Sequence, residues 1–364
     1  MDFTFSSEQD ELRRSMRAFL VARSPASHVA AMESDPLGTT PALWDDLAAL
    51  GAVGLLVPAS HGGAGAGLVD ALVVLEEVGR VPFPGPYWSS AVFATLAARR
   101  LGLDDRFAAL ASGATRAAIA LEEQGGGDPV ARVRTRGVRD GGRWLLTGTK
   151  PIVIGGYGAD WVLVVARTER GIGTFVLEAP DLEPVPAWDV TRKVARLVLE
   201  GREAEPVGPD GDHTALWRRI VDDANVGTCA ELVGSMESAF ELAVEFAKVR
   251  VQFGRPIAAF QAIKHKAAEM LQRIELARVG THYAAWASDV EDPVREEAAA
   301  MAKAFVAEAA IAVTSEAIQI HGGVGFTWDC PAHLHYRKAK QADLLLGYQG
   351  HQRRRLADLV IGTD

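Results

Sequence analysis

The segment 248–270, KVRVQFGRPIAAFQAIKHKAAEM, constrains the fold of this chain more than any other stretch. On both sides of it, apolar residues recur every three or four positions, which is the period of an amphipathic helix. Gly254 and Pro256 interrupt the two runs, because glycine permits a left-handed stop and proline can open a helix but cannot continue one. The spacing therefore predicts two long helices joined by a tight elbow.

The predicted elbow carries side chains suited to a ligand with both phosphate and a flat heterocycle. Arg250, Gln252 and Phe253 project together from its tip, and Gln261 follows within two turns. An arginine fork binds phosphate in bidentate geometry, and amide groups add further donors and acceptors. The alternative is an ordinary helix hairpin with a solvated tip.

The run R-x-Q-F-G-x-x-I-x-x-F-Q-x-I-x-H-x-x-A-x-M, spelled by residues 250–270, resembles the flavin-binding elbow of the acyl-CoA dehydrogenases. In that family the arginine contacts the FAD diphosphate of a neighbouring subunit, and the phenylalanine packs near the adenine. The resemblance implies these roles for Arg250 and Phe253. It also implies cofactor contacts for Gln252 and Gln261.

A second motif lies at 318–326, IQIHGGVGF, where paired glycines allow a backbone to approach a ligand closely. It resembles the family's Q-x-x-G-G-x-G-F signature, whose glutamine and glycines meet the FAD diphosphate across a subunit boundary. The resemblance implies that Gln319, Gly322 and Gly323 bind FAD.

The rest of the chain predicts an α+β protein in three parts: an N-terminal helical domain at 1–113, a middle β-domain at 114–210 and a C-terminal four-helix bundle at 211–364. Short β-like runs separated by glycine and charged turns predict an antiparallel barrel or sandwich in the middle. These runs are 117–121, 131–137, 143–150, 151–155, 159–168, 173–179 and 195–201. The Ala-rich run at 296–320 lacks strict heptads, which favours a bundle over a coiled coil. The family resemblance implies the same order.

Two local signals mark the N-terminal helices: a capping box at Ser6 and Gln9, and Thr40 before a helix that opens at Pro41. The proline-rich stretch at 82–86 resembles the branch of the family that handles bulky acyl groups, including sterol side chains.

The net charge of −9 and the isoelectric point near 5.6 argue against a nucleic-acid surface, which needs clustered basic charge. No apolar run reaches bilayer length and the first residues are too acidic for a secretory signal, so we expect a cytoplasmic protein with no membrane contact. Neither the two cysteines nor the nine histidines have the spacing of metal ligands. Reduced thiols and no metal are expected.

The catalytic base of the family is missing from its usual places. Dehydrogenation needs a carboxylate to take the α-proton, and most members hold a glutamate in a Tyr-Glu-Gly turn before the last helix. Here the matching turn is Tyr348, Gln349, Gly350, and an amide cannot accept the proton. The other position used in the family falls at Ala224. The nearest titratable groups are Asp222, Asp223 and His351.

The flavin-ring contacts also depart from the family pattern. The usual Thr-Glu-Pro turn is Glu122, Glu123, Gln124, and the usual Trp-Ile-Thr strand is Ile152, Val153, Ile154. An aromatic cover and a hydroxyl donor are both missing. We therefore expect this subunit's own flavin pocket to be altered, while its elbow and glycine motif clasp a flavin seated in a partner.

The resemblance implies an FAD-dependent acyl-CoA dehydrogenase subunit that dehydrogenates a bulky acyl-CoA at the α,β position and passes electrons to an electron-transfer flavoprotein. The favoured assembly is an α2β2 heterotetramer in which a paralogous subunit supplies the glutamate. A homotetramer with an atypical base is the alternative. A non-catalytic structural or FAD-clasping subunit and a flavin monooxygenase on the same fold also remain open.

Overall fold

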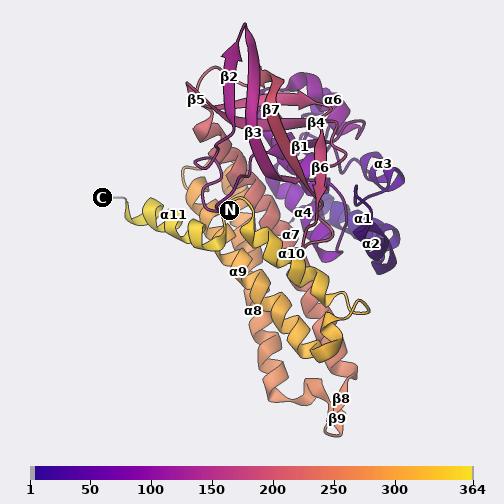
Figure 1. Ribbon diagram of the computed structural model, residues 1–364. Helices are drawn as coiled ribbons and strands as arrows, with labels where there is room; N and C mark the ends of the chain where they lie inside the picture. Colours follow the sequence, from indigo (N-terminus) through magenta and orange to yellow (C-terminus); the bar gives the residue numbers. More distant parts are fainter. Residues whose placement is uncertain (1–4, 363–364) are drawn as a thin grey trace.

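The computed structural model describes residues 5–362 and has three parts, with the barrel at one end and a long helical bundle reaching the other (Figure 1). The N-terminal helices are α1 (Ser7–Arg23), α2 (Ala26–Glu33), α3 (Pro41–Ala49), α4 (Leu68–Arg80), α5 (Thr95–Leu101) and α6 (Phe107–Ala111). A buried π-helical segment, Tyr87–Ala94, follows the proline-rich stretch.

The two predicted start signals are confirmed. Ser6 Oγ accepts from Gln9 N at 3.2 Å, and Gln9 Oε1 accepts from Ser6 N at 2.9 Å. Thr40 Oγ1 accepts from Leu43 N at 3.2 Å, and Pro41 is the first residue of α3. These bonds satisfy amide groups that the first turn of a helix leaves without partners.

The middle domain is built from β1 (Ala117–Ala120), β2 (Arg136–Asp140), β3 (Arg143–Ile154), β4 (Trp161–Thr168), β5 (Gly171–Glu178), β6 (Leu182–Val185) and β7 (Val194–Val207). Strands β4, β2, β3, β7 and β5 pair in that order, and β5 pairs back with β4, which closes a barrel. The predicted barrel is confirmed and most of its strand pairs are antiparallel, but β4 departs from the prediction because it runs parallel to both β1 and β2.

Some strand limits also differ from the prediction. The run at 131–137 becomes a strand only at Arg136, since Glu123 binds the preceding backbone amides at Arg134 and Thr135. The two runs at 143–150 and 151–155 form one strand, β3, with irregular pairing between Lys150 and Val153. Pro151 removes an amide donor from the ladder there.

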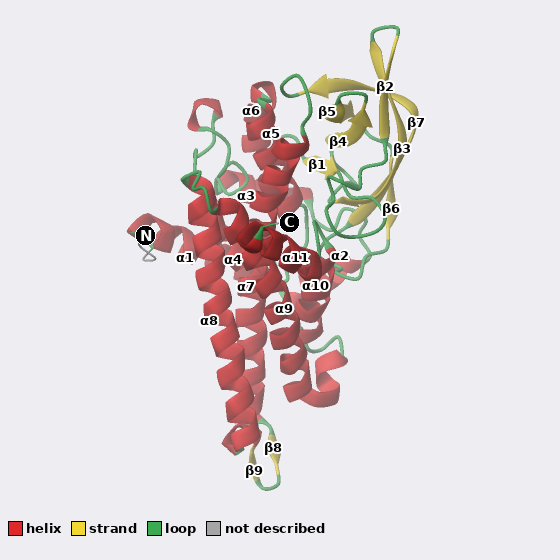
Figure 2. Ribbon diagram, turned by 90° about the vertical axis from the view of Figure 1, so that its left-hand side faces the viewer, coloured by secondary structure: helices red, strands yellow, loops and turns green. Residues whose placement is uncertain are grey.

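The C-terminal helices are α7 (Thr214–Val249), α8 (Gln261–Asp289), α9 (Arg295–His321), α10 (Ala332–Leu344) and α11 (Gln349–Ile361). Helices α7, α8 and α9 form the long bundle, α10 packs on α7 and α9, and α11 packs on α9 (Figure 2). Where α4 crosses α7, a Cβ on Gly79 would lie 1.9 Å from the Glu231 carbonyl oxygen. The two backbones therefore touch, and only glycine fits.

The elbow differs from a tight turn between helices. Short strands β8 (Val251–Gln252) and β9 (Arg255–Pro256) form a two-residue hairpin. Pro256 precedes a 3₁₀ turn, Ile257–Ala259, and α8 begins at Gln261. Phe253 and Gly254 both have positive φ, 54° and 78°, which is the backbone twist that two-residue hairpins require.

The stretch Arg295–Phe326, which contains α9, is long and apolar enough to cross a bilayer by length and composition. However, 67% of its apolar window is buried inside the molecule, as in the core helix of a bundle. Small alanine side chains on α9 let the neighbouring helices pack closely around it.

Glu76 on α4 is the centre of a buried ionic cluster that joins α1, α4 and α8. Its carboxylate lies 3.2 Å from Arg13, 3.1 Å from Arg278 and 3.1 Å from His282. Burial by itself raises the pKa of Glu76, but the His282 hydrogen bond and the two arginines outweigh burial and hold that pKa below its usual value. Ionised Glu76 therefore stabilises the fold.

This cluster predicts loss of stability in acid. Glu76 has a lower pKa in the folded protein than in the unfolded chain. Its contribution to stability is therefore fully present above the unfolded-state pKa, and it is lost as the pH falls through the folded-state pKa. In the Glu76→Gln variant, the unfolding free energy should therefore decrease less steeply as the pH falls below about 4.5, near the ordinary pKa of a glutamate. Urea titrations at several pH values measure this slope. Glu11→Gln, in an exposed pair with Arg14, is the control. An unchanged acid slope in the Glu76 variant would contradict the assignment.

Candidate cofactor and catalytic sites

The residues predicted to bind FAD lie on two exposed segments toward the far end of the bundle, the elbow with the start of α8 and the end of α9, which we together name the outer clasp. Its members are Arg250, Gln252, Phe253, Gln261, Gln319, Gly322 and Gly323, and all are exposed. The clasp and the barrel lie at opposite ends of the molecule (Figures 1 and 2). The clasp of one chain therefore cannot reach the β-domain of the same chain.

Phe253 at the tip of the clasp is both strained and solvent-exposed. Its φ of 54° is unusual for a bulky residue, and 91% of its surface is exposed. The ring of Phe260 lies edge-on to it at 6.1 Å, and Arg255 stacks on that second ring at 4.2 Å. The packing of Phe253 inside this chain does little to offset its backbone strain. Such uncompensated strain is typical of a segment that binds a ligand or partner.

The structure brings the two cofactor motifs to the same end of the bundle. Phe246, in the last turn of α7, stacks on His321, the last residue of α9, at 4.6 Å between ring centres. A Cβ on Gly322 or Gly323 would meet nothing within 4 Å, so this backbone is open to a ligand. Within residues 5–362, the Arg250 guanidinium has no carboxylate partner. These residues fit a diphosphate.

The pocket in which the family resemblance would seat the flavin ring is closed, and we name it the ring pocket. It lies between the barrel and the bundle and encloses about 10 Å³, room for roughly one water molecule. It is lined by Trp88, Phe93, Ile119, Leu121, Glu122, Ile152, Ile154, Leu345 and Leu346. A three-ring isoalloxazine does not fit these residues.

Trp88 is held in the ring pocket by a buried cation. The Arg192 guanidinium lies 4.7 Å above the indole ring and pairs with Glu231 of α7. Burial lowers the pKa of Arg192 to about 10, which still leaves the group charged at neutral pH. The indole is therefore fixed by charge and packing.

The α10–α11 loop fills the other side of the ring pocket. Glu122 Oε1 accepts a hydrogen bond from Leu346 N at 2.5 Å, and Asn225 Nδ2 donates to Leu346 O at 3.0 Å. Burial raises the pKa of Glu122, although this bond and nearby lysines oppose the rise. The sequence flagged Glu122 as a departure, but it gave no sign of its partner 224 positions away.

The second glutamate of the same turn has a structural role. Glu123 forms a buried ion pair with Lys150, at 2.7 Å between Oε1 and Nζ. Lys150 also donates to the Leu121 carbonyl oxygen at 3.2 Å. This pair fastens the turn after β1 to strand β3.

Gln349 turns away from the ring pocket, and its side chain is not among those that line the cavity. It is the first residue of α11, and its backbone amide donates to Asp343 Oδ1 at 3.0 Å. Its side-chain nitrogen lies 3.4 Å from Asp343 Oδ2. An open cleft of about 360 Å³ runs beside this start of α11 and includes His351, half-buried, whose pKa burial lowers.

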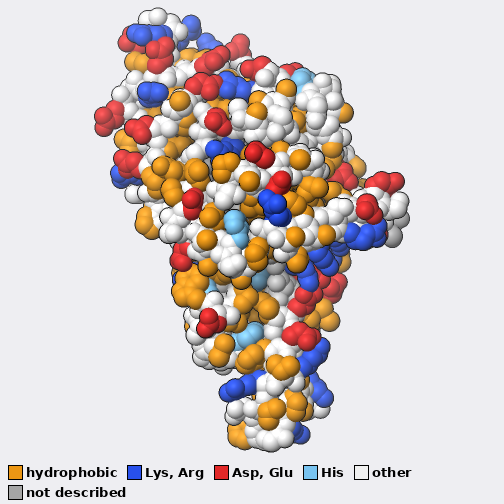
Figure 3. All heavy atoms as spheres, turned by 90° about the vertical axis from the view of Figure 1, so that its right-hand side faces the viewer, with side chains coloured by type: hydrophobic (Ala, Val, Ile, Leu, Met, Phe, Trp, Pro, Cys, Tyr) orange, Lys and Arg blue, Asp and Glu red, His pale blue; other side chains and the backbone are white. Residues whose placement is uncertain are grey.

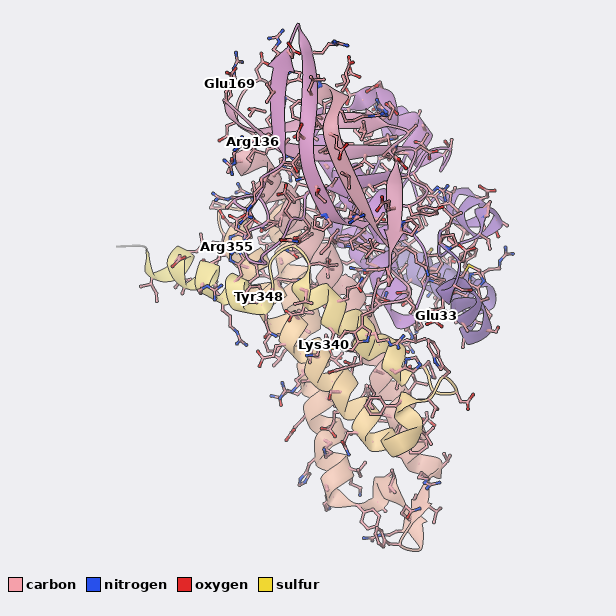
Figure 4. The ribbon with its side chains drawn as sticks, in the orientation of Figure 1. Glu33, Arg136, Glu169, Lys340, Tyr348 and Arg355 are labelled. Carbon is pink, nitrogen blue, oxygen red and sulfur yellow. The ribbon has the colours of Figure 1, made fainter. Side chains whose placement is uncertain are left out.

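The other groups near the predicted base positions are engaged elsewhere. Ala224 is fully buried. Asp222 binds both terminal nitrogens of Arg355 at 2.5 and 2.8 Å, and Asp223 pairs with Arg100 at 2.9 Å. Burial raises the pKa of Asp222 to about 6 despite its arginine partner. Figure 4 shows Tyr348, the residue before α11, and Arg355 of α11, below the barrel.

Comparisons with known proteins agree with this architecture. The models for the acyl-CoA dehydrogenase N-terminal and C-terminal domains match residues 6–104 and 217–361. Acyl-CoA dehydrogenase IpdE2 of Mycolicibacterium smegmatis is 34% identical over 96% of this chain and 98% of its own length.

Two solved structures share the fold over nearly the whole chain. A variant of the Tcur3481-Tcur3483 steroid ACAD superposes with a TM-score of 0.89 at 30% identity, covering 97% of this chain and 98% of the other. The ChsE4-ChsE5 complex from Mycobacterium tuberculosis gives 0.90 at 28% identity, covering 100% of both chains. The chain therefore belongs to the acyl-CoA dehydrogenase family, the FAD-dependent oxidoreductases that act on a CH–CH bond.

Proposed function

We propose that this chain is the cofactor-clasping subunit of a heteromeric acyl-CoA dehydrogenase that introduces an α,β double bond into a bulky, steroid-derived acyl-CoA. The observation that carries the proposal is the contrast between the two candidate sites. The ring pocket is filled by the chain's own side chains, whereas the outer clasp is open and lies at the opposite end of the molecule.

The relatives support the substrate class and the mode of assembly. The Tcur3481-Tcur3483 protein is described as a steroid ACAD, and both solved relatives pair two differently named chains. Exposed apolar side chains along α8 and α9 offer a surface for subunit contacts: Leu271, Leu276, Val279, Met301 and Phe305. Figure 3 shows apolar and basic side chains together on the narrow bundle end.

We infer that the partner supplies the catalytic base. The Gln349 amide has no basic lone pair, and the acid nearest to it, Asp343, accepts the hydrogen bond from its backbone amide. The acids beside the second family position, Asp222 and Asp223, are held by arginines. In the assembly, this chain's residues would hold the diphosphate of a flavin whose ring lies in the partner. FAD would supply hydride acceptance, and an electron-transfer flavoprotein would reoxidise it.

The test is the flavin content of the purified complex with a glutamate-bearing paralogue. A closed ring pocket in this chain predicts one FAD per pair of chains, measured by flavin absorbance against protein concentration. One FAD per chain would contradict the proposal, because this chain's own pocket would then hold a flavin.

Arg250→Ala should release flavin from the complex. The change removes a charge-assisted hydrogen-bonding group worth roughly 1.5–3 kcal/mol, which corresponds to a rise in the FAD dissociation constant of about 10- to 150-fold. Arg273→Ala, at an exposed arginine of α8, is the matched control. Full flavin retention by the Arg250 variant at low FAD concentration would show that Arg250 is not a diphosphate ligand.

A further inference from the structure

We propose that Glu122 is a latch that keeps the ring pocket of this chain closed, and that it thereby decides which subunit of the assembly seats the flavin ring. The inference rests on the proposed function, because it explains why this chain leaves the ring to its partner. It assigns Glu122 as a positioning residue that acts through the α10–α11 loop.

The loop that fills the pocket is strained. Leu346 has φ of 54°, in the left-handed region that a branched side chain seldom occupies, and Gly347 follows with φ of 92°. Such a residue persists only where its surroundings hold it in place. The loop therefore needs external contacts to keep this shape.

Three side chains from α7, α11 and the turn after β1 hold Leu346. Its carbonyl oxygen accepts from Asn225 Nδ2 of α7 at 3.0 Å and from Gln352 Nε2 of α11 at 3.4 Å. Its amide donates to Glu122 Oε1 at 2.5 Å. The first two contacts come from the bundle that carries the loop. Of these three, Glu122 alone ties the loop to the barrel side of the pocket.

The consequence of this tie is visible in the packing. Leu345 and Leu346 are 6% and 3% exposed and line the ring pocket opposite Ile152 and Ile154 of β3. The bond to Glu122 draws the two leucines against these isoleucines. Without it, the strained loop loses its hydrogen bond across the pocket, and the leucines are free to leave.

A second carboxylate beside the same loop provides a matched control. Asp343 Oδ1 accepts from Gln349 N at 3.0 Å, but Asp343 belongs to α10, so this bond stays within the bundle. Replacing Asp343 therefore removes a carboxylate-to-amide bond of the same kind without releasing the latch.

The first readout is amide hydrogen exchange of the loop peptide 344–350 in the complex with the paralogue. In Glu122→Ala, exchange at Leu346 should accelerate by about tenfold or more, the change expected when a buried amide loses its hydrogen-bond acceptor. Glu122→Gln keeps an acceptor oxygen at the same reach and should restore slow exchange. Asp343→Asn should leave the Leu346 amide protected.

The second readout is access to the opened pocket. The measurement is acrylamide quenching of Trp88 fluorescence, obtained by subtracting the signal of a Trp88→Phe background. This quenching should rise in Glu122→Ala and stay at the wild-type level in Glu122→Gln. If the alanine variant fails to fold, Glu122→Asp keeps the charge but is one methylene too short, and it should show the same two changes.

The outcomes separate the latch from the proposed function. Unchanged Leu346 exchange in both Glu122→Ala and Glu122→Asp, with one FAD per pair of chains, would overturn the latch and leave the proposed function standing. A wild-type complex with one FAD per chain would overturn both. Equal acceleration in the Glu122→Gln and Glu122→Ala variants would also overturn the latch, because the amide should rescue it.

Discussion

Mixed with a paralogous subunit that carries the glutamate, this chain is expected to support acyl-CoA oxidation at about 10²–10⁴ times the rate of the chain alone, the usual contribution of a general base. The physical reason is that, among the described residues, the carboxylates beside the ring pocket and Gln349 are already engaged, Glu122 by the Leu346 amide and Asp343 by the Gln349 amide. Gln349 faces Asp343, and its own ring pocket is closed. The measurement is anaerobic bleaching of the flavin absorbance by a steroid side-chain acyl-CoA.

The matched variant is Gln349→Glu in the isolated chain. It restores the carboxylate at the family's position, yet it leaves the ring pocket filled by Trp88 and Leu346, so we expect little gain. If the unmodified chain oxidises acyl-CoA vigorously by itself, the partner-supplied base is wrong. Asp222, Asp223 and His351 would then be the groups to replace, starting with Asp222, whose raised pKa of about 6 suits proton transfer.

Local chemistry made much of the fold predictable. The capping bonds at Ser6 and Thr40, the long uninterrupted α9 and the interruption of the elbow at Gly254 all follow from residues within a few positions of one another. Such features depend on side-chain geometry inside one turn of chain. A single sequence carries that information completely.

The features that escaped prediction all depend on distant partners. The parallel pairing of β4 with β1 joins residues far apart in the sequence, such as Trp161 and Ala117, and β6 is a strand only because β7 offers it an edge. The closed ring pocket is the same kind of case. Glu122 stood out as an anomaly in its turn, but its function depends on Leu346, which the fold brings next to it.

The ion pair between Lys150 and Glu123 is expected to be the most sensitive point for stability in the barrel. Lys150→Met should lower the unfolding free energy by about 3–5 kcal/mol, because it leaves a buried carboxylate without its cation. The Lys150 side chain is fully buried, and burial lowers its pKa to about 8, which leaves the ammonium charged at neutral pH. Urea unfolding at pH 7 measures the loss.

A double-variant cycle decides whether the pair itself or the lost packing is responsible. Glu123→Gln added to Lys150→Met removes the orphaned charge, so the double variant should be more stable than Lys150→Met, although Glu123 also accepts bonds from Thr135 N at 3.0 Å and Thr135 Oγ1 at 2.8 Å. Arg143→Met breaks an exposed pair with Glu203 in the same domain and should cost under about 1 kcal/mol. Equal losses for Lys150→Met and Arg143→Met would mean that Glu123 finds another cation or takes up a proton. The turn after β1 would then not depend on this ion pair, and the position of Glu122, one residue earlier, would have to be fixed by its contact with Leu346 alone.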